Sequence, residues 1–236
     1  MRVLLICDDY WHPGQVPIDG VAPLKEPGLN SNGIQSEGFQ FDIISDAKDF
    51  KSQALSEYPV VILVKSDQVS QQDKASWKTE AVQQAFVAYV ENGGGLLAIH
   101  SGTVPSKENK GLEQLLGCRF TGHPEACPVT VQPVKPHPVT KDVGMFCETD
   151  EHYRIEILSP DVDVLAASYS SAQGTPEKYK EDPGKNTPAS IYPAAYVRTQ
   201  GKGRVCVLTP GHLLPVWLNP NFQRMLANAL TWCGGK

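Results

Sequence analysis

The histidine in the stretch GGGLLAIHSG, residues 93 to 102, stands where a side chain could do chemistry. The stretch predicts a helix end, a buried strand and a sharp turn, with His100 in the turn. Small neighbours let the backbone turn tightly and expose only the middle side chain, as in the elbows that carry enzyme nucleophiles. Because such elbows are strained and lie where ligands bind, we expect a functional His100; a histidine bonded to neighbouring backbone is the structural alternative.

Three other residues are expected to meet His100: His212 at the end of the last predicted strand (TPGH), Glu151 in DEHY and His123 in TGHP. Parallel strands of a doubly wound sheet bring their carboxyl ends to one edge, so these side chains should line a single pocket. An imidazole, with an unperturbed pKa of about 6.5, accepts and donates protons near neutral pH. We therefore predict catalytic roles for His100, His212 and Glu151. A solvated turn around Glu151 and a turn cap at His123 are the alternatives.

Substrate contacts are predicted from the loops near these positions. The first predicted strand ends in CDDYWHPG, and the loop after the first strand forms one wall of the crevice in such sheets. Trp11 could stack on a substrate ring or pack against the protein, and the hydroxyl of Tyr153 could hydrogen-bond a substrate. His137 is interpreted as structural, and His152 is left outside the site. The predicted substrate-binding residues are Asp9, Trp11, His12, Ser101, His123 and Tyr153, with Asp8 as a further polar candidate.

Histidines and carboxylates are also ligands of zinc and manganese. Here they are scattered along the chain without a local i, i+4 pair, so the sequence leaves a divalent metal open and predicts no other cofactor. No G-x-G-x-x-G motif follows a predicted strand, which favours a hydrolase or a lyase over a redox enzyme.

The first half of the chain alternates between apolar strands and helices. Unalternating apolar runs at 1–7, 41–46 and 60–66 are typical of parallel strands buried on both faces, and we expect the first to lie inside the sheet. Residues 72–95 predict a helix whose apolar positions recur from Trp77 to Val90 and which ends at Asn92 and Gly93. A second, short helix is predicted at 109–118.

The second half is richer in short β-like segments. Residues 128–143, 153–158 and 161–169 are separated by prolines and predict an added antiparallel edge. Residues 170–190 are polar and rich in Pro, Gly and Lys, which predicts a long surface loop or flap. Two strands joined by a Gly-Lys-Gly turn are predicted at 194–212. An amphipathic helix at 219–235 should be capped by Asn219, with Pro220 at its first position.

Several stretches together resemble the ThuA-like (trehalose utilisation) family of the class I glutamine amidotransferase-like superfamily. They are GGGLLAIHSG, LLGCRFTGHP, HPVTKDV, DEHY, GKGRVCVLTPGH and the following W-x-NPNFQRMLANALTW. The resemblance implies an α/β fold: a flavodoxin-like, doubly wound, mostly parallel sheet with a small added antiparallel β region. Two features depart from the family pattern. Tyr196 stands where tryptophan is expected, and leucines follow His212 where an acidic residue often stands.

The resemblance also implies a function in the use of trehalose or a related sugar or keto-sugar. Glutaminases of the superfamily use an elbow cysteine activated by a histidine and a carboxylate. This chain has His100 at the elbow and no glutamate two residues after His212, so we expect no glutaminase activity. The leading interpretation is an enzyme with an acid–base or metal-assisted His/Glu site. The alternative is a non-catalytic sugar-binding or partner-binding protein; a cysteine-elbow redox or stress protein is disfavoured.

Composition sets outer bounds on these interpretations. The 236 residues are 41% hydrophobic and 20% charged, which is typical of a globular protein, and we expect one domain over 1–236. A formal net charge of -5 argues against a nucleic-acid partner.

The sequence shows no signal peptide and no apolar run of about 20 residues, so we expect a cytoplasmic protein without a membrane partner. The expected partner is a small sugar or keto-sugar, and a homo-oligomer is left open. The six cysteines lack a C-x-x-C pair and are expected to be mostly buried.

Overall fold

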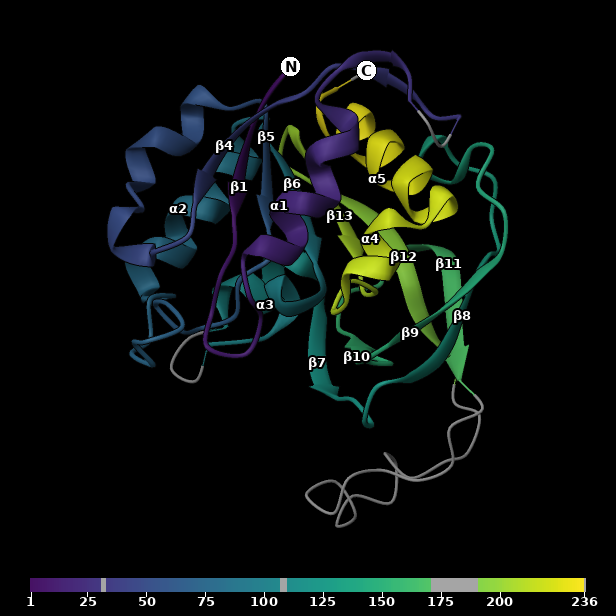
Figure 1. Ribbon diagram of the computed structural model, residues 1–236. Coiled ribbons are helices and arrows are strands. Elements are labelled where there is room, and N and C mark those ends of the chain that lie inside the picture. Colours follow the sequence, from purple (N-terminus) through teal and green to yellow (C-terminus); the bar gives the residue numbers. More distant parts are fainter. Residues whose placement is uncertain (31–32, 107–109, 171–190, 236) are drawn as a thin grey trace.

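The computed structural model describes residues 1–30, 33–106, 110–170 and 191–235 (Figure 1). Within these ranges a nine-stranded sheet has the order β4-β1-β5-β6-β13-β12-β11-β8-β9. Its parallel half consists of β4 (Gln40–Ile44), β1 (Arg2–Ile6), β5 (Val60–Leu63), β6 (Gly95–Ile99) and β13 (Gly203–Leu208). Its antiparallel half consists of β12 (Ile191–Gln200), β11 (Asp163–Ser170), β8 (Cys127–Pro133) and β9 (Phe146–Asp150).

The parallel half follows the chain order second, first, third, fourth, fifth, which is the flavodoxin-like order. The expected fold class is therefore confirmed. β1 lies between β4 and β5, as predicted from its apolar run, and its residues after Arg2 are buried. The prediction for residues 41–46 is wrong in one respect, because β4 is an edge strand and Ile43 is 39% exposed. An edge strand has only one hydrogen-bonded neighbour, so its apolar residues need not be covered on both faces.

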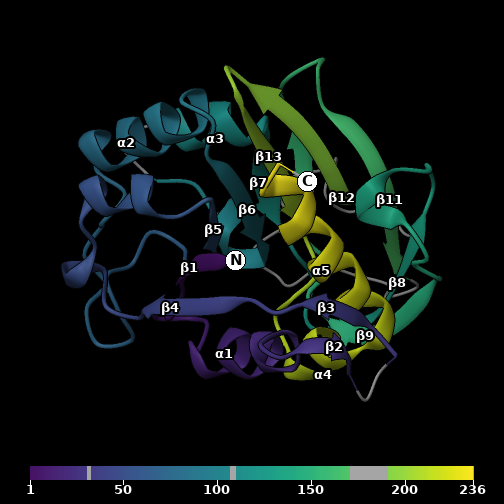
Figure 2. The same cartoon turned by 90° about the horizontal axis from the view of Figure 1, so that it is seen from above.

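Helices cover both faces of the sheet (Figure 2). One face carries α1 (Gln15–Val21), α4 (Leu214–Leu218) and α5 (Pro220–Cys233), and the other carries α2 (Glu80–Glu91) and α3 (Gly111–Leu116). Asn219 caps α5 by accepting from the backbone nitrogen of Asn221, as predicted. Trp77 was expected inside α2 but lies before it. The side chain of Thr79 caps the helix, and Trp77 packs edge-on against Phe86 from the preceding loop.

Smaller elements complete the described chain. Residues 153–158 do not join the antiparallel edge as expected: β10 (Arg154–Ile157) pairs instead with β7 (Cys118–Gly122) in a separate sheet. β2 (Pro27–Leu29) pairs with β3 (Gln35–Glu37). Short 3-10 helices are η1 (Ala22–Leu24), η2 (Ala47–Asp49), η3 (Ser52–Glu57), η4 (His100–Thr103) and η5 (Pro138–Thr140).

Three further expectations concern loops, membranes and cysteines. Apart from Ser170, the predicted loop at 170–190 lies outside the described residues. Within the described part of the chain, no helix is long and apolar enough to cross a bilayer. Five of the six cysteines are buried, as expected, while Cys147 is exposed.

The turn after β6 has the strained backbone of the predicted elbow, but the prediction of an exposed middle side chain is wrong, because His100 is fully buried. His100 opens η4 with a φ of +47°, and the hydroxyl of Thr103 donates to its carbonyl oxygen at 2.7 Å. Gly102 lies against β5, so that a Cβ atom placed there would be 2.0 Å from the carbonyl oxygen of Leu63. Since backbone atoms cannot move aside easily, only glycine fits at this position.

We predict that Gly102→Ala lowers the free energy of unfolding by about 2 kcal/mol or more, because the added methyl group forces the elbow away from β5. Urea denaturation measures the loss. Gly144→Ala is the control, since the nearest atom to its Cβ would be the tip of the Asn221 side chain at 3.1 Å. Equal losses in the two variants would contradict the proposed packing.

Candidate functional site

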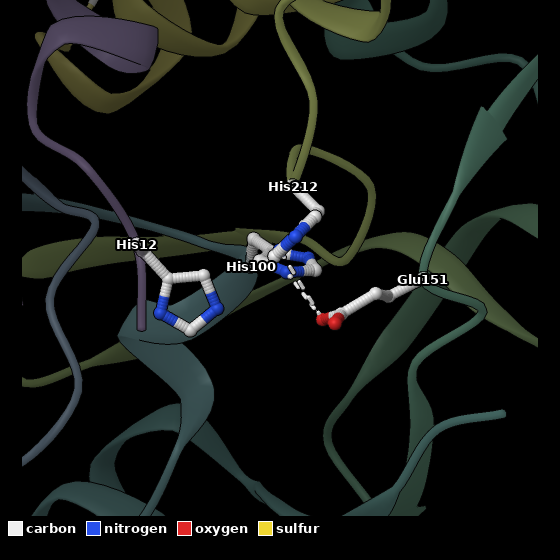
Figure 3. Close-up of side chains that lie close together, drawn as sticks. All are labelled: His12, His100, Glu151 and His212. Carbon is white, nitrogen blue, oxygen red and sulfur yellow. Dashed lines mark hydrogen bonds and ion pairs between the residues drawn. The ribbon is translucent and has the colours of Figure 1, made fainter. Parts of the chain in front are cut away.

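A carboxylate and several histidines meet at the carboxyl ends of the parallel strands (Figure 3). Glu151, between β9 and β10, places Oε2 3.2 Å from Nε2 of His100 and 3.3 Å from Nδ1 of His212. Its Oε1 lies 3.5 Å from Nδ1 of His123, which follows β7. His100 follows β6 and His212 follows β13. The four side chains expected in one pocket therefore do converge, whereas their chemical roles remain predictions.

His100 is fully buried and has a defined tautomer. Its Nδ1 lies 3.0 Å from the carbonyl oxygen of Thr209. A carbonyl oxygen only accepts, so Nδ1 donates and the lone pair of the neutral ring is on Nε2. Burial lowers the pKa of His100 to about 4, although the contact with Glu151 opposes this shift. The structural alternative, with both ring nitrogens bonded to backbone, is not what the structure shows.

The contact between His100 and Glu151 joins a ring nitrogen to a carboxylate oxygen. Burial by itself would raise the pKa of Glu151, but the contact with His100 and the nearby His123 and His212 hold it well below its usual range. In the neutral ring whose Nδ1 donates to Thr209, Nε2 is an acceptor like the carboxylate oxygen, and the two atoms lie 3.2 Å apart. A cation between them would satisfy both atoms. Nδ1 of His212 is likewise buried without a hydrogen bond in the described structure.

The loop of His212 is held by Asp150. This buried carboxylate accepts from the backbone nitrogens of Gly211 at 2.8 Å and His212 at 2.9 Å. Burial raises the pKa of Asp150 to about 7, although these hydrogen bonds act in the opposite direction. The residue before Glu151 thus fixes the position of a histidine that Glu151 contacts.

Asp9 is buried and holds His12 in place. It is fully buried, and its Oδ1 lies 2.8 Å from Nδ1 of His12 and accepts from the backbone nitrogen of Trp11 at 2.9 Å. Its Oδ2 accepts from the backbone nitrogen of Ser66 at 2.8 Å. The predicted contact of Asp9 with substrate stays a prediction. Burial works against ionisation, but the contacts with His12, Ser66 and Trp11 together keep the pKa of Asp9 below its usual range.

His12, expected as a substrate contact, belongs to the central cluster. Its ring centroid lies 5.3 Å from that of His100 and 5.2 Å from that of His212. One ligand atom from each of four residues lies within 4.8 Å of the others; they are His12, His100, Glu151 and His212. Zinc binds nitrogen at about 2.0–2.1 Å with tetrahedral geometry, which places its ligands about 3.4 Å apart, so the set is slightly wider than the shell of one ion and would have to close around it. The bond from His12 to Asp9 is the usual support of a metal-binding histidine.

The remaining predicted residues surround this cluster. Tyr153 is 2% exposed and stacks on His100 with centroids 3.7 Å apart and on His123 at 5.4 Å. It supports the histidines from within the protein, and its expected contact with a sugar stays a prediction. Ser101 is fully buried, and its hydroxyl has no hydrogen-bond partner in the described structure. Trp11 is 64% exposed on the loop after β1.

Two cavities matter for the site. A small one of about 10 Å³ is bounded by His12, His100, Ser101 and His212, and it holds about one water-sized group. A groove of about 980 Å³ lies between residues 133–142 and the end of α5, apart from the cluster. His137 lines this groove, and its Nδ1 accepts from the backbone nitrogen of Val139, which agrees with the structural interpretation.

Lys65, which the sequence analysis missed, fixes the loop that carries His12. Its amine is buried and donates to the carbonyl oxygens of Cys7, Asp8 and Ser45. Burial lowers its pKa, against the opposing effect of Asp9. A lysine directly after the apolar run VVILV was the available signal, because a buried amine requires nearby acceptors.

These observations can be set beside known proteins. A family model described as ThuA, trehalose utilisation, matches residues 2–233. The chain belongs to the ThuA family. No curated protein has a significant match to it.

Solved structures similar to this ThuA-family chain share its fold. A ThuA-like protein from Bacteroides uniformis is 23% identical with a TM-score of 0.70, covering 99% of this chain and 91% of that one. One from Parabacteroides merdae is 18% identical with a TM-score of 0.70 and coverages of 100% and 90%. A cytoplasmic protein from Salmonella typhimurium is 17% identical with a TM-score of 0.56 and coverages of 99% and 97%.

His152 lies outside the cluster, as expected, and its titration can be followed separately. It is 5% exposed, its Nε2 lies 3.1 Å from the hydroxyl of Ser168, and burial lowers its pKa to about 4. In the unfolded chain the pKa is about 6.5, so the unfolded state binds a proton first as the pH falls. The stability associated with neutral His152 is thus present above pH 6.5 and is lost between about pH 6.5 and 4.

We predict that acidification from pH 7 to 4 lowers the unfolding free energy of the wild type more than that of His152→Gln, by on the order of 2 kcal/mol. Glutamine can still bond Ser168 but does not titrate. Urea denaturation of both proteins across this pH range measures the difference. Parallel pH profiles would show that His152 does not have a lowered pKa.

Proposed function

We propose that this ThuA-family chain is a metal-dependent enzyme that acts on a sugar or keto-sugar as a hydrolase or lyase. The observation that carries the proposal is the set of four ligand atoms from His12, His100, Glu151 and His212, which lie within 4.8 Å of one another. Trehalose utilisation, the description of the family, supports a carbohydrate substrate. The proposed location is the cytoplasm, as in the description of the similar Salmonella protein.

A divalent metal, when bound, would polarise a substrate oxygen and lower the pKa of a bound water. His12, His100 and His212 would supply nitrogen ligands, and Glu151 would supply the negative charge. The carbonyl of Thr209 keeps Nε2 of His100 free for this purpose by holding the proton on Nδ1. Each of these groups is oriented before substrate arrives, which favours catalysis.

His123 is proposed to move protons between the site and solvent. Its Nδ1 lies 3.5 Å from Oε1 of Glu151, which is the carboxylate oxygen that does not contact His100. The side chain of His123 is 20% exposed. A partly exposed imidazole can exchange protons with water and still reach the reacting groups. Acid–base catalysis by His100 itself is less favoured, because its lowered pKa makes it a weak base at neutral pH.

The second candidate function is non-catalytic binding of a sugar on the same scaffold. The small cavity beside the cluster, about 10 Å³, has no room for a sugar ring, so a sugar would have to bind above it. Replacing a ligand of the metal separates the two candidates. If sugar binding persists in such a variant, an enzyme would still lose its turnover, whereas a binding protein would keep its function.

We predict that the purified protein binds one Zn²⁺ or Mn²⁺ ion per chain and that His100→Gln weakens binding about 100-fold or more, because glutamine removes one nitrogen ligand. Titration calorimetry measures the affinity, and circular dichroism checks the fold of the variant. His137→Gln is the matched control, since His137 lies in the remote groove. Affinity should fall as the pH drops toward 4, because His100, whose burial lowers its pKa to about 4, must be neutral to bind metal. Metal binding that is absent, or equal in the two variants, would contradict the proposal.

We also predict that the protein releases no ammonia from glutamine, because the elbow carries an imidazole and not a thiolate. A coupled glutamate dehydrogenase assay measures this release. Turnover at a rate typical of enzymes would show that the site retains glutaminase chemistry.

A further inference from the structure

Trp11 is exposed beside the metal-binding cluster. It is 64% exposed, which excludes the packing role that the sequence left open. Its ring meets that of Tyr10, itself 38% exposed, at 87° with centroids 4.7 Å apart. An edge-to-face contact covers at most one face of the indole, so a second face is open to solvent. Leaving so large an apolar ring in water is unfavourable unless a ligand covers it.

The position of Trp11 is tied to the cluster by Asp9. Oδ1 of Asp9 accepts from the backbone nitrogen of Trp11 at 2.9 Å and also contacts Nδ1 of His12 at 2.8 Å. The backbones of Asp9 and His12 exchange two further hydrogen bonds, of 3.1 and 3.3 Å, across Trp11. One buried carboxylate therefore fixes both a proposed metal ligand and the exposed aromatic residue next to it in the chain.

The support of Tyr10 is also defined. Nζ of Lys74 lies 3.7 Å from the centroid of the Tyr10 ring, so this cation covers the tyrosine and not the tryptophan. Tyr10 thereby braces Trp11 from one side. The exposed pair is small and is bordered by polar or partly polar residues of the same loop, Asp8 and His12. Such a patch suits a small ligand with one apolar face better than a lipid surface or a large protein interface.

We propose that Trp11 is the platform on which a pyranose ring of the substrate stacks while its reacting end lies at the cluster. The inference rests on the proposed function and adds the residue that selects a sugar ring. A pyranose has an apolar face of C–H groups, which the negative face of an indole attracts, and it carries hydroxyl groups on its rim. Trp11 directly precedes His12, whose ring lies in the cluster, so the indole and a proposed metal ligand leave neighbouring positions of the same turn, with Cα atoms about 3.8 Å apart.

Sugar binding to the zinc-loaded protein tests this proposal. Trehalose and methyl α-D-glucopyranoside are titrated by calorimetry and by tryptophan fluorescence into the wild type, Trp11→Ala and Trp11→Phe. We expect Trp11→Ala to weaken binding about 3- to 10-fold, and Trp11→Phe to weaken it less, since phenylalanine keeps a flat aromatic face. Leu29→Ala is the control, because Leu29 is 72% exposed on β2. Zinc affinity should be the same in all four proteins.

The outcomes separate this proposal from the proposed function. Unchanged sugar affinity in Trp11→Ala, with zinc still bound, would overturn the platform and leave the metal site intact. A dimeric wild type that becomes monomeric in Trp11→Ala without a change in sugar affinity would assign Trp11 to a contact between copies, and would also overturn it. A wild type that binds zinc but neither sugar would contradict the carbohydrate function together with the platform.

Discussion

The half-buried carboxylate of Glu151 lies against His100, His123 and His212, and the arrangement of the site depends on this contact. Taking an anion out of water is costly unless hydrogen bonds or a positive charge compensate for it. Here burial lowers the pKa of the nearest histidine, His100, and so disfavours its charged form. A divalent cation would provide the missing charge and would use the lone pairs of the histidines. Charge balance and ligand geometry thus favour the same occupant.

The two halves of the sheet contribute different parts of this arrangement. The parallel half brings His12, His100 and His212 to one edge, because its strands end on the same side. The antiparallel half delivers Glu151, which follows the edge strand β9 and is held near His212 by Asp150. Neither half contains a complete set of ligands. The site therefore depends on the junction between the two halves of the sheet.

The sequence predicts those parts that local rules control. Apolar runs located β1 and β5, and Asn219 with Pro220 located the start of α5. Strand ends also predicted that His100 and His212 would meet. Partners across the chain escaped prediction: the bond between Asp9 and Ser66 joins residues 57 positions apart, and no local pattern marks it. The exposure of Trp11 could not be predicted either, because the sequence does not show whether a tryptophan packs or faces solvent until the conformation of its loop is known.

X-ray absorption at the zinc edge of the zinc-loaded protein tests the central claim most directly. The account predicts nitrogen and oxygen neighbours at about 2.0–2.1 Å, with the outer-shell scattering of about three imidazole rings and no sulfur at about 2.3 Å. The His100→Gln protein, loaded at higher zinc, should show one imidazole fewer. A sulfur neighbour, or a spectrum that His100→Gln leaves unchanged, would contradict the assignment of this cluster as the metal site.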